Sequence, residues 1–265
     1  MITSYGNKSV KEVIQLNQRA KVRDEQDLFV AEGVKMFAEA PAERIHRVYI
    51  ARRAEEDIRR AYGEKLNGLS VEIVADDVFD KMSDTRTPQG ILCLVRQFHY
   101  DIDDLLAGTR NKQHALFILL EDLQDPGNLG TVFRTGEGAG VDGIIMSNWT
   151  VDLYNPKTIR STMGSVYRVP FLYTDNLGGA IRTLQQHGIR VYAAHLGGTG
   201  YYDEYDYHGG TAFLVGNEGN GLREETAGCA NECLKIPMEG SVESLNAAVA
   251  SSILLYEAYR QRRTR

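Results

Sequence analysis

Two almost uninterrupted apolar runs constrain the fold most strongly. They are ALFILLE (115–121) and TAFLVG (211–216). A strand with one face in water alternates apolar and polar residues, whereas a strand covered on both faces is apolar along its length, as in a parallel sheet. Further strands are expected at 142–147, 167–173, 189–196 and 233–238, and helices at 126–140, 155–164, 177–188, 222–230 and 244–261. The second part of the chain therefore predicts an open, mostly parallel α/β sheet with helices on both faces.

The first hundred residues alternate between helix and strand in the same way, with shorter elements. After a helix, loop, strand and helix over 8–40, the expected elements are strands at 46–51, 70–75 and 90–98 and helices at 55–66 and 76–84. The helix at 76–84 is expected to have Asp76 or Asp77 as its N-cap. A polar seam, HYDIDDLLAGTRNKQ (99–113), separates this part from the next. We therefore expect a small α/β domain over 1–105 and a larger one over 106–265.

Charge and composition exclude several classes of protein. The net charge of −6 counts against a chain that binds nucleic acid by bulk electrostatics, although a local basic surface stays possible. The candidates for such a surface are the arginines near the end of the chain, Arg260, Arg262, Arg263 and Arg265. No apolar run approaches the ~20 residues of a membrane helix, and the N-terminus does not resemble a signal peptide, so the cytoplasm is expected. Three cysteines predict neither a disulfide framework nor a metal site.

The stretch LEDLQDPGNLGTVFRTGEGAGV (120–141) follows the first apolar strand. Asp125 is expected to cap a helix that has Pro126 in its first position. Asn128 and Arg134 lie six residues apart, close to two helical turns, so both are expected on one side of this helix. A guanidinium among small residues needs an anionic partner. Either a carboxylate, Glu121 or Glu137, or an incoming phosphate fits that requirement.

Two further stretches follow strand ends, where open α/β sheets bind ligands. FLVGNEGNGL (213–222) runs from a strand into three glycines, a turn that can lie against a flat ligand, with Glu218 inside it. CLKIPMEGSVESLNAAVA (233–250) ends a strand and opens the last helix, which Ser244 is expected to cap. Ser244 and Asn246 together place more polar groups at this helix N-terminus than a cap requires. No G-x-G-x-x-G or P-loop lysine accompanies the glycines, so a dinucleotide site is disfavoured.

Together these three stretches resemble the signature motifs of the SpoU, or TrmH-like, branch of the SPOUT RNA methyltransferases. The first motif is NLGTVFRTGEGAGV (128–141), the second LVGNEGNGL (214–222) and the third IPMEGSVESLNAAVA (236–250). The resemblance covers about residues 115–262 and rests on the content, order and spacing of the motifs. Gly136 stands where relatives often carry alanine. The first hundred residues resemble, more loosely, the L30e-like substrate-binding domain of many relatives.

The resemblance implies an α/β fold whose C-terminal part forms a trefoil knot, against the general rule that chains are unknotted. It implies S-adenosylmethionine as cofactor, bound in that knot, and a ribose 2′-hydroxyl of RNA as the methyl acceptor. The matching cofactor-binding positions are Gly216, Ile236 and Leu245, with Leu196 and Met238 as further walls. No metal is required. Relatives are homodimers in which the residue matching Arg134 reaches the partner's site, and the terminal arginines would either contact RNA or be solvated.

The resemblance also suggests roles for five polar side chains. Arg134 is expected to hold a phosphate next to the ribose and orient the hydroxyl, since a group with a pKa above about 12 is a poor base. Asn128, Ser244 and Asn246 would supply neutral hydrogen bonds. Glu218 would be structural or would position the arginine. No other residue of the motifs is an obvious base, so the proton acceptor stays open.

Three alternatives differ in testable ways. A tRNA ribose methyltransferase would share all three motifs, but the separate N-terminal domain and the acidic charge favour ribosomal RNA, with 23S rRNA first. A non-catalytic RNA-binding protein of the same fold would be expected to lack the arginine, which is present. An NAD-dependent oxidoreductase would need the missing glycine fingerprint.

Overall fold

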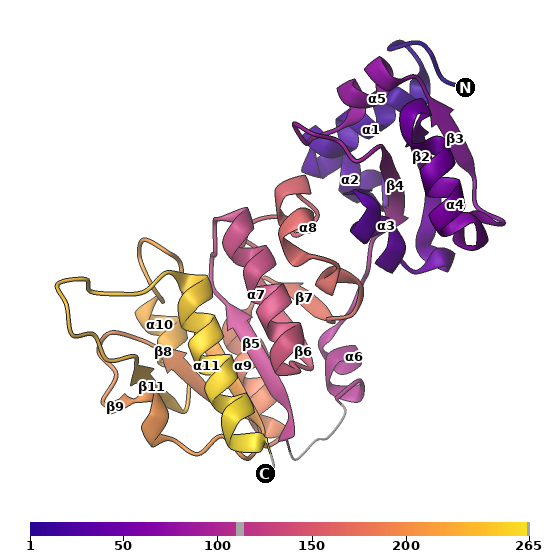
Figure 1. Cartoon of the computed structure of the whole chain (residues 1–265). Coiled ribbons are helices and arrows are strands. Elements are labelled where there is room, and N and C mark those ends of the chain that lie inside the picture. The colour runs from indigo at the N-terminus through magenta and orange to yellow at the C-terminus, as the bar shows by residue number, and fades with distance from the viewer. Residues whose placement is uncertain (110–113, 264–265) are drawn as a thin grey trace. The chain divides into compact units, whose positions relative to one another are not determined.

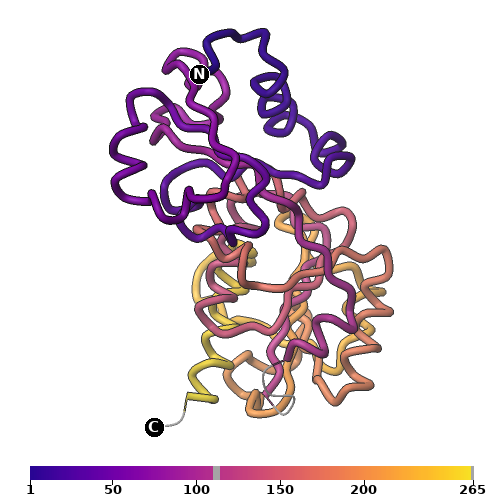
Figure 2. The backbone as a smooth tube through the Cα atoms, turned by 90° about the vertical axis from the view of Figure 1, so that its right-hand side faces the viewer, coloured from indigo at the N-terminus to yellow at the C-terminus, as the bar shows by residue number. Residues whose placement is uncertain are grey.

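The computed structural model describes residues 1–109 and 114–263, and its chain divides into two compact units (Figure 1). Unit 1 contains residues 1–98 and 152–167, and unit 2 contains residues 99–151 and 168–265. The backbone trace leaves unit 2 after Val151 and returns to it at Arg168 (Figure 2). Residues 110–113 of the polar seam, and Arg265 among the terminal arginines, lie outside the described residues.

Unit 1 is a small four-stranded sheet covered by helices. The strand order is β1-β4-β2-β3, with β4 antiparallel to both neighbours and β2 parallel to β3. The strands are β1 (Leu28–Glu32), β2 (Ile45–Ala51), β3 (Val71–Val74) and β4 (Ile91–Arg96), and the helices are α1 (Lys8–Gln18), α2 (Ala20–Gln26), α3 (Val34–Glu39), α4 (Glu55–Leu66) and α5 (Asp76–Met82). The apolar faces of α1 and α5 pack on this sheet around Val13, Leu16 and Phe79. The alternation of helix and strand expected for the first part of the chain is thus confirmed.

The segment 152–167, although it lies between two strands of unit 2, completes the core of unit 1. It contains α8 (Pro156–Thr162) and a short 3-10 turn (Ser165–Tyr167). The ring of Tyr154 stacks on Phe29 at 4.7 Å between centroids. The hydroxyl of Tyr167 donates to the carbonyl of Met36 at 3.1 Å. Asp152 forms an ion pair with Arg23, which is buried.

Unit 2 is built on a seven-stranded sheet in the order β7-β6-β5-β10-β8-β11-β9. All its strand pairings are parallel. The strands are β5 (Leu116–Leu120), β6 (Gly143–Ser147), β7 (Phe171–Thr174), β8 (Arg190–Ala194), β9 (Gly200–Tyr201), β10 (Thr211–Val215) and β11 (Glu232–Lys235). The two apolar runs form β5 and β10, which are central, adjacent and buried along their whole length. The predicted parallel α/β sheet is confirmed.

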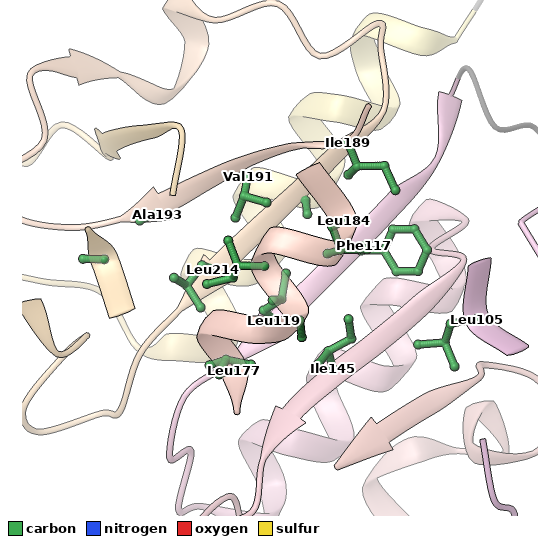
Figure 3. Packing of buried hydrophobic residues seen from close by; sticks show 14 of the residues in the cluster. Leu105, Phe117, Leu119, Ile145, Leu177, Leu184, Ile189, Val191, Ala193 and Leu214 are labelled. Carbon is green, nitrogen blue, oxygen red and sulfur yellow. The ribbon is translucent and has the colours of Figure 1, made fainter. Parts of the chain in front are cut away.

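Helices cover both faces of the larger sheet. They are α6 (Ile102–Ala107), α7 (Pro126–Ala139), α9 (Leu177–Gln186), α10 (Glu224–Ala227) and α11 (Ala247–Arg262). On one face α7 and α11 lie side by side (Figure 1). On the other, Leu177 and Leu184 of α9 pack against Phe117, Val191 and Leu214 of the strands (Figure 3).

Helix α11 crosses the sheet and is fixed at both ends. Its last turn carries Arg262, which is half-buried and donates to backbone carbonyls just before β5 and β10. The acceptors are Tyr207 at 2.7 Å, His114 at 2.7 Å, Ala115 at 3.2 Å and Gly209 at 2.7 Å. Arg260 pairs with Glu257 of the same helix. The fold therefore holds Arg262, against the expectation that it contacts RNA or is solvated, whereas Arg263 is exposed.

Two local expectations are wrong for identifiable reasons. The strand expected at 167–173 begins only at Phe171, because Tyr167 belongs to the 3-10 turn of unit 1 and Pro170 has no N–H for a ladder. Helix α5 is preceded by Ala75 as its cap, because Asp76 is already inside the helix and accepts from the N–H of Arg53. Helix α6 forms within the polar seam at 99–113, behind a capping box at Asp101.

Candidate functional site

A cavity of about 270 Å³ opens at the carboxyl ends of β8, β10 and β11. Three segments line it: the chain after β8, the glycine turn after β10, and the loop from β11 to the first turn of α11. All five residues expected to bind the cofactor border this one cavity, namely Leu196, Gly216, Ile236, Met238 and Leu245. The volume is close to the lower end of the ~300–1,000 Å³ typical of small-molecule pockets.

The turn after β10 needs its glycines for reasons of space and conformation. A Cβ on Gly216 would lie 2.2 Å from the carbonyl carbon of Gly221, because the turn folds back onto its own start. Gly221 has φ +68°, a left-handed conformation that favours glycine. The two ends of the turn are joined by reciprocal backbone hydrogen bonds between Asn217 and Gly221, at 3.0 and 2.9 Å. The glycine density thus builds a rigid wall of backbone along the cavity.

Glu218, at the tip of this turn, connects it to the start of α7. Its carboxylate accepts from the side chain of Asn128 at 2.9 Å and from the backbone N–H groups of Gln124 and Asp125, both at 3.0 Å. Partial burial opposes ionisation, but these hydrogen bonds outweigh it and hold the pKa of Glu218 below its ordinary value. None of these partners of Glu218 in the described structure is an arginine, so of its two expected roles the geometry supports the structural one.

Asn246 joins the same network from the third segment. Its amide donates to the side-chain oxygen of Asn128 at 3.0 Å, and its own oxygen accepts from the N–H groups of Ala248 and Val249. Asn246 is therefore the N-cap of α11. The expectation that Ser244 caps this helix is wrong, because the helix begins at Ala247. Ser244 lies instead in the preceding loop, where it borders the cavity.

Arg134 is exposed on α7, two turns beyond Asn128. Both carboxylates that might have paired with it have other partners. Glu121 is buried and binds Arg223 and Thr226, and Glu137 pairs with Arg168. Within residues 1–109 and 114–263, no ion pair or hydrogen bond involves the guanidinium of Arg134. The cap predicted for its helix is confirmed, since Asp125 accepts from the N–H of Asn128 and Pro126 occupies the first position.

Several residues of the site were not expected from the sequence. His195, Lys235 and Glu243 border the cavity, and Gln124 and Arg223 hold the neighbouring turns. His195 immediately follows β8, so the rule that ligands bind beyond the carboxyl ends of strands could have found it. Arg223 could not have been found in this way, because its partner Glu121 lies about a hundred residues earlier in the chain.

The described part of the chain holds no group of three or more His, Cys, Asp or Glu side chains arranged to bind a metal ion. None of its helices is long and apolar enough to cross a membrane. The three cysteines are free thiols, of which Cys93 is buried while Cys229 and Cys233 are half-buried.

Comparisons with known proteins agree with this geometry. The model of the SpoU rRNA methylase family matches residues 115–256, more than half of the chain. The chain belongs to this family. An MRM3-like substrate binding domain matches residues 7–93. The enzyme is therefore a methyltransferase, as its three motifs indicated, and S-adenosylmethionine is its cofactor.

Named relatives and solved structures of similar length support the assignment. The 23S rRNA (guanosine(2553)-2′-O)-methyltransferase RlmP of Bacillus subtilis is 31% identical, covering 96% of this chain and 97% of the relative. RlmB of Shewanella oneidensis, a 23S rRNA (guanosine-2′-O-)-methyltransferase, is 31% identical over 89% of this chain and 98% of its own. The AdoMet-bound rRNA methyltransferase of Sinorhizobium meliloti superposes with a TM-score of 0.83 at 32% identity, covering 98% and 97% of the two chains.

The residues around the cavity fit this cofactor. S-adenosylmethionine combines a flat adenine with a charged sulfonium and an amino-acid group. Apolar side chains of Leu196, Ile236 and Leu245 provide a surface for the ring. The glycine turn 216–221 lines the cavity closely with its backbone, and the carboxylates of Glu218 and Glu243, which also border the cavity, suit a cationic ligand.

Proposed function

We propose that this SpoU-family methyltransferase methylates a ribose 2′-hydroxyl of ribosomal RNA, with the large subunit's 23S rRNA as the substrate. The observation that carries the proposal is the exposed, unpaired guanidinium of Arg134 on the helix that also carries Asn128. Both structural explanations for this arginine are excluded by the partners of Glu121 and Glu137. The names of the relatives RlmP and RlmB point to the same chemistry and to 23S rRNA.

In this proposal the cavity holds the cofactor through the five residues Leu196, Gly216, Ile236, Met238 and Leu245. S-adenosylmethionine supplies an electrophilic methyl group on a sulfonium, which an oxygen can displace without a metal. The protein's part is then to orient the ribose, which can contribute much of the rate. Arg134 binds the phosphate beside the reacting ribose by a forked contact and thereby directs the hydroxyl.

The linked amides of Asn128 and Asn246 fix the geometry at the mouth of the cavity. Asn246 uses its oxygen for the helix cap and its amide for Asn128, so its orientation is set. Glu218 accepts from the amide of Asn128 and fixes that side chain as well. Such preorganised dipoles need not reorient when the ribose binds. Ser244 has no hydrogen-bond partner among the described residues, so its hydroxyl is free to bond the ribose or the phosphate.

Assembly, domain roles and location are part of the same proposal. A homodimer would bring Arg134 to the partner's cavity, and three exposed side chains of α11 would lie within its interface: Val249, Tyr256 and Tyr259. Residues 1–105 would bind the RNA and residues 106–265 would carry the catalytic domain, with the trefoil knot formed around the cavity. The enzyme would act in the cytoplasm.

One experiment tests the reaction and its substrate together. Purified protein is given S-adenosylmethionine labelled with tritium in the methyl group, with total rRNA or total tRNA from cells that lack the gene. The proposal expects label in 23S rRNA at one alkali-resistant dinucleotide, lost in Arg134→Ala and retained in Glu137→Ala on the same helix. Label in tRNA would instead support a tRNA ribose methyltransferase. Binding of the cofactor without transfer to either RNA would contradict the proposal for naked RNA.

A further inference from the structure

The chain's one tryptophan lies on the surface of unit 2. Trp149 follows β6 at the carboxyl edge of the sheet, and 76% of its surface is exposed, more than for any other large apolar residue in the described chain. Its neighbour Thr150 is buried. An exposed indole leaves in water one of the largest apolar surfaces that a side chain can bury. We therefore expect an exposed tryptophan at the edge of a site to contact a ligand.

The loop that carries Trp149 is held on both sides, so the indole has a fixed base. The carbonyl of Trp149 itself accepts from the side-chain amide of Gln124 at 2.6 Å. Backbone N–H groups before and after it are also bonded: Asn148 to Thr174 at 2.9 Å, Thr150 to Ser147 at 2.9 Å and Val151 to Leu123 at 2.8 Å. An exposed aromatic ring on a loop anchored in this way loses little conformational freedom when a partner stacks on it.

Hydrogen bonds connect this loop to the site. Gln124, which bonds the carbonyl of Trp149, donates its backbone N–H to Glu218 at 3.0 Å. The same carboxylate accepts from Asn128 at 2.9 Å. Trp149 is thus linked through Gln124 to the carboxylate of Glu218. That carboxylate positions the side-chain amide of Asn128, which is proposed to bind the ribose. No catalytic role assigned above uses it.

We propose that Trp149 is a stacking platform for an unpaired base of the RNA substrate that lies close to the methylated ribose. This inference rests on the proposed function. A single flat ring suits a base, because proteins recognise single-stranded RNA by stacking its splayed bases on aromatic side chains. A protein partner would need a contiguous apolar patch. The exposed neighbour Asn148 instead carries an amide suited to the edge of a base, and Gln124, whose amide nitrogen already donates to the carbonyls of Asp122 and Trp149, still offers its exposed oxygen.

Because Trp149 is the only tryptophan, its fluorescence reports on this position directly. The protein is first saturated with S-adenosylmethionine and then titrated with a fluorescently tagged single-stranded RNA of mixed sequence, and with an abasic oligomer of equal length. The tag is excited outside the indole band, so its anisotropy measures binding. We expect indole emission to fall in proportion to the bound RNA, and to stay unchanged with the abasic oligomer. RNA binding without any change in indole emission would overturn the proposal, as would an absence of RNA binding.

Methyl transfer separates this inference from the proposed function. Trp149→Leu keeps an apolar side chain and removes the ring, and we expect it to raise the KM for rRNA by about 5- to 150-fold, the range given by the loss of one stacked base. Its affinity for S-adenosylmethionine should be unchanged, and Trp149→Phe should restore most of the RNA affinity. If the wild type is active and Trp149→Leu has the same KM for rRNA, the stacking proposal is refuted and the methyl-transfer proposal stands. An inactive wild type whose indole is still quenched by RNA would refute the methyl-transfer proposal alone.

Discussion

Two arginines of unit 2 show how differently the same side chain can be used. Arg262, at the end of α11, donates to four backbone carbonyls beside the amino ends of β5 and β10. Arg134, in the middle of α7, is exposed and has no partner in the described structure. Both helices lie on the same face of the sheet. An arginine that the fold needs is surrounded by acceptors, whereas Arg134 still lacks one, which is why we assign its acceptor to the substrate.

The most severe test of this comparison is Arg134→Ala. We expect kcat to fall by about 10²- to 10³-fold, the usual cost of removing one preorganised charge-stabilising donor. The free energy of unfolding should change by less than ~0.5 kcal/mol, because the side chain is exposed and makes no contact that folding requires. Arg134→Lys keeps the positive charge but loses the forked geometry of the guanidinium, so its kcat should lie between those of the wild type and Arg134→Ala. Methyl-transfer kinetics and urea denaturation measure the two quantities, and a large loss of stability would show that Arg134 is structural after all.

The opposite pattern is expected for Arg262→Ala. Removing this side chain leaves four backbone carbonyls without their charged donor, those of Tyr207 and Ala115 in partly buried surroundings, and we expect the free energy of unfolding to fall by about 2–4 kcal/mol. Methyl transfer per folded molecule should be unchanged. Urea denaturation followed by circular dichroism checks the first statement, and activity normalised to bound S-adenosylmethionine checks the second. Selective loss of RNA binding in this variant would contradict the structural role.

A smaller effect on kcat is expected for Glu218, which holds the glycine turn to the start of α7 and also positions Asn128. Glu218→Gln retains one acceptor but loses the charge, so Asn128 and the start of α7 should be held less firmly, and kcat should fall by about tenfold. The pKa of Glu218 is lowered in the folded protein, so its contribution to stability is full above the ordinary value of about 4.3 and is lost as the pH falls through the lowered pKa. The stability difference between wild type and Glu218→Gln should therefore be present at pH 7 and disappear in acid. A difference that grew as the pH fell would contradict this assignment.

The smallest effect is expected at Glu137, three residues from Arg134. Its exposed ion pair with Arg168 should contribute no more than about 1 kcal/mol, so Glu137→Ala should lower the free energy of unfolding by that amount or less. Methyl transfer should be unchanged. If activity fell as in Arg134→Ala, the loss would belong to the helix as a whole, and the contrast between the two arginines would weaken.

The sequence predicted the central elements well because their signals are local. The runs that form β5 and β10 are apolar at almost every position, and Asp125-Pro126 is a strong start for α7. The cavity residues could be named because the motifs that resemble the SpoU family mark strand ends, although their roles are still proposals. In each of these cases the signal lies within a short stretch of sequence, so it can be recognised without knowing the fold.

Features that depend on distant partners could not be predicted. The carbonyls that bind Arg262 come from residues 114–115 and 207–209, and the ring that stacks on Tyr154 belongs to Phe29. The sequence does not distinguish Ser244 from Asn246 as the cap, because both residue types favour that position, and only the bonds that Asn246 makes in the fold identify it. Trp149 carries no sequence signal of its own, since exposure of a single residue is decided by the fold.

The return of residues 152–167 to unit 1 has a practical consequence for dissecting the enzyme. A gene shortened to begin after Phe98 would not yield an intact unit 2 alone, because it would retain Tyr154 and Tyr167 while deleting Phe29 and the carbonyl of Met36. A gene ending at Phe98 would leave Arg23 buried without Asp152. Separate expression of either part therefore calls for the loop between β6 and β7 to be moved with its unit: grafted onto the first fragment, and replaced by a short polar turn in the second.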